Sequence, residues 1–336
     1  MVKLFEKAVV FTDIHLGLKS NSELHNQDCV DFVKWMVLKG KEHKCDSCIF
    51  MGDFHNNRSS INIMTLNHSV RVLEMLSENF DKIYFIPGNH DIFFKDKRDI
   101  QSITWAKHIK NVIIINEITT LHDVTFVPWL VKEEFKKLKT ISSKYMFGHF
   151  ELPNYYMNSM VKMPEHGEFN ETYLQKIEKV FSGHFHKRQS SGNVTYIGNC
   201  FPHNFGDAND DDRGCMILGW NEEPEYYAWP HQPKYRIYKL SELVNDPENL
   251  LKPKMYVKVH IDFPITYEES LYIREQLIEQ YNLREFTLIP QKTEIQNSET
   301  TSLTFKSVDQ IVSEEIGKIT SEQFNTSTLL DIYQKL

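Results

Sequence analysis

Short apolar runs recur along the first 190 residues, and each ends in a cluster of polar residues. Five of them are AVVFTDIH (8–15), SCIFMGD (47–53), KIYFIPGNHD (82–91), KYMFGHFE (144–151) and KVFSGHFH (179–186). Apolar runs of this length that stop at turn-forming residues are typical of buried strands. We therefore predict a strand at each of these positions.

Helical periodicity appears between the predicted strands. Residues 24–40, 61–76 and 134–139 are predicted to be helices, because their apolar side chains recur at helical spacing. The apolar positions that share one side are Val30, Phe32, Val33, Val37 and Leu38 in the first stretch, and Ile63, Leu66, Val70 and Leu73 in the second. Strands that alternate with helices indicate an α/β domain.

The pattern changes after residue 190. The runs GNVTYIGN (192–199), GCMILGW (214–220) and EYYAWP (225–230) predict a second, more antiparallel sheet. Prolines interrupt the chain at 231–238 and 245–254, so we place a domain boundary near residue 250. Beyond it, residues 255–263 and 284–290 predict two strands that flank a helix at 265–281. We expect a main domain (1–250), a small α/β cap domain (251–295), and a linker with C-terminal helices (296–336).

Two amphipathic helices are predicted in the last segment. Their apolar positions are Val308, Ile311, Val312, Ile316 and Ile319, then Leu329, Leu330, Tyr333 and Leu336. Apolar side chains at this spacing form a stripe that must be covered. Either the helices cover the sheet of the small domain, or they bind a partner protein.

Composition narrows the class of protein. The net charge is −8, with 38 basic and 46 acidic residues, so no overall positive field attracts the chain to nucleic acid. Five irregularly spaced cysteines suggest free thiols in a reducing cytoplasm, and the Cys45-x-x-Cys48 pair lacks a second pair for a zinc site. Apolar runs stay far below the roughly 20 residues that span a bilayer. The N-terminus resembles a first strand rather than a signal peptide, and we expect a cytoplasmic protein without a membrane segment.

Metal-ligating side chains stand at the ends of all five predicted strands. The groups are Asp13-x-His15, Gly52-Asp53, Gly88-Asn89-His90-Asp91, Gly148-His149 and Gly183-His184-x-His186. A lone His-x-His is often a surface accident, but ligands in α/β sheets gather outside the carboxyl ends of the strands. Residues far apart in sequence are therefore expected to meet in one crevice. The glycines that precede four of these groups allow tight turns and close backbone approach.

The donor set indicates which metals are expected. It contains two aspartates, one asparagine and four histidines, with no thiolate: Asp13, His15, Asp53, Asn89, His149, His184 and His186. Mixed oxygen and imidazole donors suit Mn²⁺, Fe²⁺ or Zn²⁺ better than Ca²⁺. Seven ligands exceed what one cation ordinarily takes, and a bridging carboxylate commonly holds two cations about 3.5–4 Å apart. Two divalent cations are therefore predicted.

The motifs DIH, GD, GNHD, GH and GHFH, in this order, resemble those of the calcineurin-like metallophosphoesterase family over roughly residues 8–200. The resemblance implies an α/β fold with a two-sheet sandwich flanked by helices (α/β/β/α), a small α/β cap domain and C-terminal helices. It assigns Asp13, His15 and His186 to the first metal, Asn89, His149 and His184 to the second, and Asp53 to the bridge. It also implies that His90 stabilises the transition state or protonates the leaving oxygen, with Asp91 orienting it.

Further segments narrow the resemblance. VPWL (127–130), GHFELPNYY (148–156), YIGN (196–199) and GDANDDDRG (206–214) resemble phage-encoded SbcD-type recombination endonuclease subunits. This implies a DNA nuclease, exo- or endonucleolytic, that uses two cations, expected to be Mn²⁺ with Mg²⁺, Fe²⁺ or Zn²⁺ as alternatives. Its expected role is hydrolysis of phosphodiester bonds in recombination, repair and end processing, in the host cytoplasm.

The same resemblance implies partners. An SbcC-type ATPase would receive the C-terminal helices, the cap domain would contact DNA, and a homodimer would form through the helix at 61–79, with Ile63, Leu66 and Val70 as its face. Core packing is the alternative for that face. Because the chain is acidic, DNA phosphates would be held by the metals, the partner, and patches such as Lys187–Arg188 and Lys95–Arg98.

Two other functions remain open. A metallophosphoesterase for phosphoproteins or small nucleotides would share the metal site, although GDFHNN lacks the GDxVDRG pattern of Ser/Thr phosphatases. A catalytically silent scaffold for the ATPase is the second. His55, two positions after Asp53, is either a substrate-side group or an exposed loop histidine.

Overall fold

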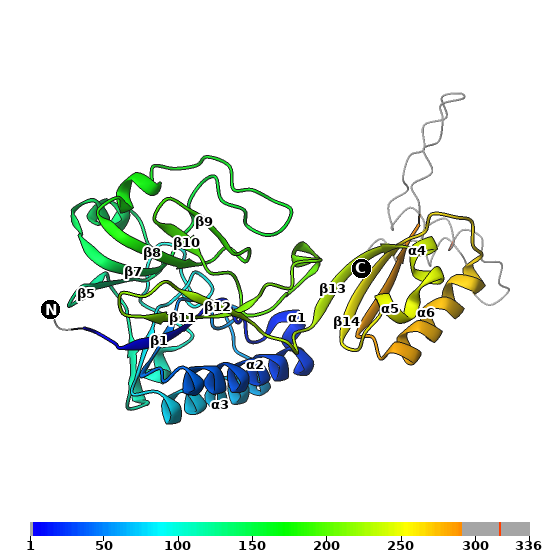
Figure 1. Cartoon of the computed structure of the whole chain (residues 1–336), viewed down its shortest axis with the longest axis horizontal. Helices are drawn as coiled ribbons and strands as arrows, with labels where there is room; N and C mark the ends of the chain where they lie inside the picture. Colours follow the sequence, from blue (N-terminus) through cyan, green and yellow to red (C-terminus); the bar gives the residue numbers. More distant parts are fainter. Residues whose placement is uncertain (1–2, 291–315, 317–336) are drawn as a thin grey trace. The chain divides into compact units, whose positions relative to one another are not determined.

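The computed structural model describes residues 3–290 and residue 316. The helices predicted within 296–336 therefore lie, except for Ile316, outside the described residues. The described chain contains three sheets with six, six and three strands (Figure 1).

The first sheet contains the first three of the predicted strands. Its order is β12 (Glu225–Ala228), β11 (Gly214–Gly219), β1 (Lys7–Phe11), β2 (Ser47–Phe50), β3 (Lys82–Phe85) and β4 (Val112–Ile114). Strands β1 to β4 are parallel, whereas β11 is antiparallel to β1 and to β12. Helices α2 (Glu23–Glu42) and α3 (Ile63–Asn79) lie side by side on one face of this sheet (Figure 1).

The second sheet contains the other two predicted strands. Its order is β5 (Thr119–Leu121), β6 (Val124–Val127), β7 (Ser143–His149), β8 (Ile177–Gly183), β10 (Val194–Tyr196) and β9 (Gln189–Ser191). Strands β6, β7, β8 and β10 are parallel, and β5 and β9 are antiparallel at the edges. Short 3₁₀ segments lie along the chain at Thr104–His108, Glu134–Thr140, Glu171–Leu174 and Phe205–Asp207.

The two large sheets pack face to face. Side chains alternate along β1, because successive residues of a strand point to opposite faces. Val9 and Phe11 pack with the helices, whereas Ala8 and Val10 pack between the sheets against Phe147. This arrangement confirms the predicted α/β fold class with a two-sheet sandwich and flanking helices.

Both long helices begin at side-chain caps. The Ser22 hydroxyl accepts the His25 backbone N–H at the start of α2, and the Asn62 side chain accepts the Met64 N–H at 2.9 Å at the start of α3. Such caps satisfy backbone donors that the first turn leaves unpaired. The predicted inner face of α2 is buried except at Leu38, and Ile63 of α3 is 79% exposed.

The prediction of a separate antiparallel sheet after residue 190 is wrong. Strands β9 and β10 extend the second sheet, and β11 and β12 extend the first. The reason lies in the burial of β11: all six of its residues are buried, so it needs apolar neighbours on both faces. Pairing with β1 supplies them, because β1 lies between the helices and the second sheet.

The third sheet has its own hydrophobic core. Strands β13 (Lys234–Lys239), β14 (Met255–His260) and β15 (Glu285–Ile289) are parallel and pack with α4 (Leu240–Asn245), α5 (Pro247–Leu250) and α6 (Tyr267–Tyr281). The predicted strands and helix beyond residue 250 are therefore present. Because β13 precedes residue 250, this sheet begins before the expected boundary, and the division into domains stays a prediction.

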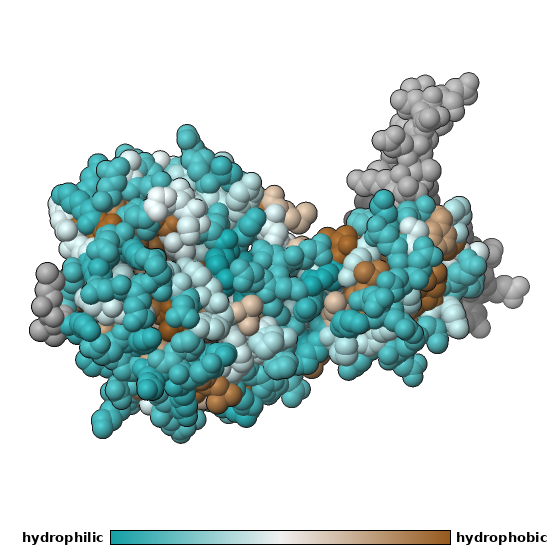
Figure 2. Space-filling view, viewed as in Figure 1, coloured by the Kyte–Doolittle hydropathy of each residue, from teal (hydrophilic) through white to brown (hydrophobic). Residues whose placement is uncertain are grey.

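The surface of this part carries exposed apolar side chains. Val244, Phe263 and Leu271 are exposed, and Figure 2 shows hydrophobic atoms over the lobe that contains α4, α5 and α6. All five cysteines lie in the described part, where none forms a disulfide. Within residues 3–290, the helices lack the combination of length and hydropathy that a bilayer crossing requires.

Candidate metal centre

The ends of five strands meet at one edge of the sandwich. Strands β1, β2 and β3 run parallel in one sheet, and β7 and β8 run parallel in the other. The residues after them form groups whose ligand atoms lie within 4.8 Å of one another: Asp13 with His15 and His186, Asp53 with His149 and His184, and His15 with Asp53 and His90. The structure thus brings together six of the seven predicted ligands in these groups, and Asn89 joins them through His149.

Asp53 lies in the middle of the site. Its Oδ2 atom is 3.6 Å from His15 Nε2 and 3.4 Å from His149 Nε2, so imidazoles of both predicted metal positions face the same oxygen. The backbone N–H of His90 donates to the other oxygen, Oδ1, at 2.9 Å. This geometry suits a carboxylate shared by two cations.

The first half of the site contains polar atoms without hydrogen-bond partners. Asp13 Oδ1 lies 3.8 Å from His15 Nε2 and 3.9 Å from His186 Nε2. Among the described residues, Asp13 Oδ1 and both ring nitrogens of His15 are buried and unpaired. Because buried polar atoms almost always have a partner, their donor character and position fit a bound cation.

In the second half, hydrogen bonds orient the imidazoles. His149 Nδ1 donates to the Met51 carbonyl at 2.7 Å, which leaves Nε2 beside Asn89 Oδ1 at 3.1 Å. His184 Nε2 lies 3.1 Å from a carboxylate oxygen of Glu151, which leaves Nδ1 for a cation. A carboxylate or carbonyl on the far nitrogen is the usual support of a metal-ligating histidine.

The backbone of the site is strained. Asp13, His15, Asp53 and His184 have positive φ angles of 52°, 48°, 61° and 85°. Non-glycine residues in this region cost about 1–3 kcal/mol each, and such strain clusters at functional sites. Four of the seven predicted ligands are therefore held in conformations that the surrounding packing must enforce.

Glycines provide the space for this packing. A Cβ on Gly88 would lie 2.3 Å from Asp53 Oδ1, and one on Gly183 would lie 2.1 Å from Thr12 Oγ1 and 2.9 Å from Asp13 Oδ2. Gly52 has a φ of 105°, and its Cβ would lie 2.4 Å from His149 Nδ1. The close approach that the sequence motif predicts is present at all three positions.

Asp91 has a different role from the predicted one. Its carboxylate accepts the backbone N–H groups of Asp53, Phe54, His55 and Gly88 at 2.9–3.1 Å. The His90 ring is held instead by the Asn56 carbonyl, which accepts from Nδ1 at 2.7 Å. Asp91 therefore fixes the loop that carries Asp53, and the hypothesis that it orients His90 does not agree with these contacts.

His55 is neither of the two alternatives that the sequence leaves open. It is buried, and its ring nitrogens lie 2.8 Å from Ser102 Oγ and 2.9 Å from Ser69 Oγ. Burial lowers the pKa of His55 to about 3, so the ring is neutral. Its hydrogen bonds connect α3 to the loop after β2, which indicates a structural role.

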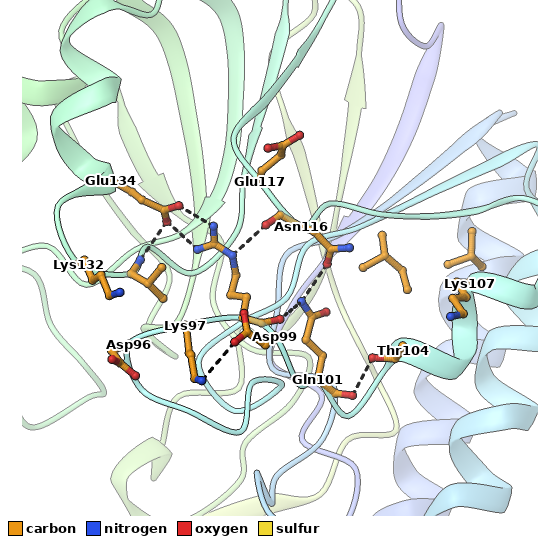
Figure 3. A pocket seen from close by; sticks show the side chains of 14 residues that line it. Asp96, Lys97, Asp99, Gln101, Thr104, Lys107, Asn116, Glu117, Lys132 and Glu134 are labelled. Carbon is orange, nitrogen blue, oxygen red and sulfur yellow. Dashed lines mark hydrogen bonds and ion pairs between the residues drawn. The ribbon is translucent and has the colours of Figure 1, made fainter.

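The contacts of Arg98 and Arg188 do not agree with their predicted role in binding DNA phosphates. The Arg98 side chain is 9% exposed, pairs with Glu134 at 2.7 Å and donates to the Trp129 carbonyl at 2.7 Å. Arg98 and Glu134 both line a cavity of about 760 Å³, and Figure 3 shows Glu134 in this cavity together with Lys97, Lys107 and Lys132. Arg188 likewise pairs with Asp212 at 2.6 Å. Both guanidinium groups are engaged within the protein.

Arg98 supports the metal centre through Trp129. The Trp129 ring centroid lies 5.1 Å from that of His184 and 5.9 Å from that of His149. By binding the Trp129 carbonyl, Arg98 holds the loop that presses this indole against two predicted ligands.

Sequence reasoning missed three neighbours of the ligands. His203 Nε2 donates to the Asp13 carbonyl at 2.8 Å, and its ring packs on those of His15 and His186. Asp207 Oδ2 lies 3.8 Å from His186 Nδ1. Glu151 and Asp207 fall inside the motifs GHFELPNYY and GDANDDDRG, which is a signal for them, whereas His203 stands outside every motif.

Charges in the site are distributed unevenly. Burial alone would lower the pKa of His149, but the Asp53 carboxylate outweighs it and raises this pKa to about 9. Burial would raise the pKa of Asp53, yet His149 and His15 hold it well below its usual value. For His15 burial prevails and lowers the pKa. The charges of the His149 imidazolium and the Asp53 carboxylate therefore stabilise each other.

The fold and this site define a metallophosphoesterase. The chain matches the calcineurin-like phosphoesterase family over residues 7–188, more than half of its length, and belongs to that family. Exonuclease subunit 1 of Enterobacteria phage T4 is 28% identical over 224 residues, which cover 64% of this chain and 65% of that protein. The match thus spans slightly less than two thirds of that relative.

Two solved structures are similar at lower levels. The Pseudomonas putida nuclease MPE is 18% identical with a TM-score of 0.29, and the match covers 56% of this chain and 66% of the nuclease. A dimetal phosphatase from Danio rerio is 10% identical with a TM-score of 0.40, covering 66% of this chain and 96% of the phosphatase.

The contact of Gly183 with Asp13 gives a testable prediction. We expect Gly183→Ala to lower the free energy of unfolding by about 1–3 kcal/mol, because the added methyl group overpacks the site, and to weaken Mn²⁺ binding. Thermal unfolding and isothermal titration with Mn²⁺ measure both effects.

Gly192→Ala is the matched control. Nothing in the described chain lies within 4 Å of its Cβ position, so only its φ of 55° is disturbed, at about 1–2 kcal/mol. Metal binding should survive in this control. Mn²⁺ affinity equal to wild type in the Gly183 variant would contradict the prediction.

Proposed function

We propose that this chain is a two-metal-dependent DNA nuclease that hydrolyses phosphodiester bonds in DNA recombination, repair and end processing. The main support for metal dependence is the position of the Asp53 carboxylate, because an imidazole from each half of the site faces the same carboxylate oxygen. The choice of DNA as substrate is supported by the relative named as an exonuclease subunit.

The proposed ligand sets follow the two halves of the site. Asp13, His15 and His186 would hold one cation, and Asn89, His149 and His184 the other, with Asp53 between them. We propose Mn²⁺ for both, with Mg²⁺, Fe²⁺ or Zn²⁺ as alternatives, because the donors are mixed oxygen and imidazole. When bound, such cations supply Lewis-acid activation of water and of the phosphoryl group.

His90 is the proposed acid of the reaction. Its Nδ1 donates to Asn56, so Nε2 is left for a proton exchange or a hydrogen bond at the site. The ring packs edge-on against His15, with centroids 4.9 Å apart. His90 also lines a cavity of about 320 Å³ together with Asp53, His184 and His186. A leaving oxygen in this cavity would lie within reach of His90.

A nuclease assay tests the proposed function. We expect the purified chain to cleave plasmid and linear DNA with Mn²⁺, and to lose this activity in EDTA and regain it when Mn²⁺ is restored. A phosphopeptide and a small nucleotide are assayed in parallel. Cleavage that persists in EDTA, or hydrolysis of the phosphopeptide without hydrolysis of DNA, would refute the proposal.

His90 should affect turnover more than metal binding. We expect His90→Ala to slow DNA cleavage by about 10²–10⁴-fold, the usual contribution of a general acid, while Mn²⁺ affinity stays near that of wild type. The exposed His108 provides a control, since His108→Ala should change neither quantity. An equal loss of cleavage and metal binding would show that His90 is not an acid but part of the metal site.

Three further features belong to the proposal. We place the protein in the cytoplasm of the host cell and expect an SbcC-type ATPase as its partner. Except for Ile316, the residues predicted to bind that partner lie outside the described residues. The exposed side chains Val244, Phe263 and Leu271 offer further apolar surface. The part from β13 to β15 is proposed to act as the DNA-contacting cap.

Homodimerisation through α3 is also proposed. Its buried residues are Thr65, Ser69, Val72, Leu73 and Leu76, so Ile63 is not used by the core. We expect wild type to sediment as a dimer and Ile63→Glu as a monomer, because a buried carboxylate without a partner opposes association. Val244→Glu, at an exposed position of α4, serves as the control. A dimer that survives Ile63→Glu would exclude this face.

A further inference from the structure

A hairpin stands beside the metal centre in the segment between β7 and β8, drawn in green in Figure 1. We call residues 154–163 the 154–163 hairpin. Its two arms are joined by backbone hydrogen bonds from Asn154 to Met163, from Met163 to Tyr155 and from Met157 to Val161, at 2.7–2.9 Å. The Asn158 side chain closes the turn by accepting the N–H groups of Met160 and Val161, both at 2.9 Å.

The turn end of the hairpin is attached to the metal site. The backbone N–H of His186, a proposed ligand, donates to the Met157 carbonyl at 2.9 Å. The backbone N–H of Ser159 donates to Gly206 at 3.1 Å, in the segment that also carries Asp207. Met157 and Asn158 line the cavity of about 320 Å³ that contains Asp53 and His90. These contacts therefore fix the position of the hairpin relative to the proposed ligand His186.

The tip of the hairpin is apolar and exposed. Met160 is 69% exposed and Val161 is 49% exposed. Their backbone N–H groups are nevertheless held by the Asn158 side chain, which fixes the turn. Single exposed apolar residues are common. Here two adjacent exposed apolar residues follow Asn158, which lines the cavity of the site, and proteins that bind DNA insert apolar side chains between base pairs.

One arm adds an aromatic ring with nearby lysines. Tyr156 is 42% exposed, and Lys187 Nζ lies 4.7 Å from its ring centroid. Tyr156 is bridged to Lys162 across the hairpin, and all three residues line one cavity of about 640 Å³. An exposed ring beside cations suits a nucleic-acid strand, because bases stack on the ring and phosphates bind the lysines.

We propose that the 154–163 hairpin binds the DNA strand being cleaved, and that Met160 and Val161 separate a terminal base pair so that one strand enters the cavity. This inference rests on the proposed nuclease function. Asp13, Asp53 and His149 are buried, and Met157 and Asn158 of the hairpin line the cavity that contains Asp53 and His90, so a strand that enters this cavity passes the hairpin. A cavity of about 320 Å³ is also the size of a site for one small ligand, which favours a single strand.

The test compares three substrates with the full chain and Mn²⁺. They are a blunt duplex, a single-stranded oligonucleotide, and bis(p-nitrophenyl) phosphate, a small diester that needs no strand separation. We expect the double variant Met160→Ser, Val161→Ser to cleave the duplex at least about tenfold more slowly. Hydrolysis of the small diester should change by less than about twofold, because the changes lie on the surface. Leu38→Ser, at an exposed position of α2, is the matched control and should leave all three rates unchanged.

A second readout follows base separation directly. A phosphorothioate-protected duplex carries 2-aminopurine at its terminal pair, whose fluorescence rises when the base leaves the stack. Wild type should raise the fluorescence and the double variant should not. Duplex cleavage at the wild-type rate by the double variant, or no fluorescence rise with wild type, would overturn the inference. If wild type hydrolyses the small diester but neither DNA substrate, the proposed nuclease function itself fails.

Discussion

The buried carboxylate of Asp53 is the interaction on which the site depends. A lone carboxylate in this position would be costly, because burial removes the water that stabilises its charge. His15 from the first sheet and His149 from the second face the same oxygen, and the His90 N–H binds the other. The packing of the two sheets thus determines whether these imidazoles meet the carboxylate. A change in the packing between the two sheets would for this reason also change the geometry of the proposed metal ligands.

A second carboxylate shows how the protein enforces that arrangement. Asp91 occupies no predicted metal position, yet its four N–H bonds connect the loop after β2 to the loop after β3. Each of these bonds satisfies a backbone donor that would be costly to leave unpaired in the interior. They offset the left-handed backbone of Asp53, whose φ is 61°. The hydrogen bonds of Asp91 thus offset the strain of the loop that carries Asp53, and they hold the Asp53 carboxylate in place.

Sequence patterns were sufficient for features whose causes are local. Strand β1, which precedes Asp13, and strand β7, which ends at His149, could be predicted because each is an apolar run followed by a ligand motif. The strand that pairs with β11 could not be predicted. All six residues of β11 are buried, and such a strand fits either of the two sheets. Contacts between distant segments were equally invisible: Asp91 binds the N–H of Asp53, 38 positions earlier, and Arg98 pairs with Glu134, 36 positions later. Such pairs form only after the chain has folded.

Many basic side chains of this acidic chain form ion pairs within the protein. Five arginines pair with carboxylates within the protein: Arg98, Arg188, Arg213, Arg236 and Arg284. Guanidinium groups suit this use because their planar donors match carboxylates in pairs. Lys162 and Lys187 line the cavity beside Tyr156 of the 154–163 hairpin, where we propose that the DNA strand binds. If the proposed function holds, a protein with net charge −8 would bind DNA phosphates through local cations and not through its overall field, and non-specific binding along DNA would stay weak.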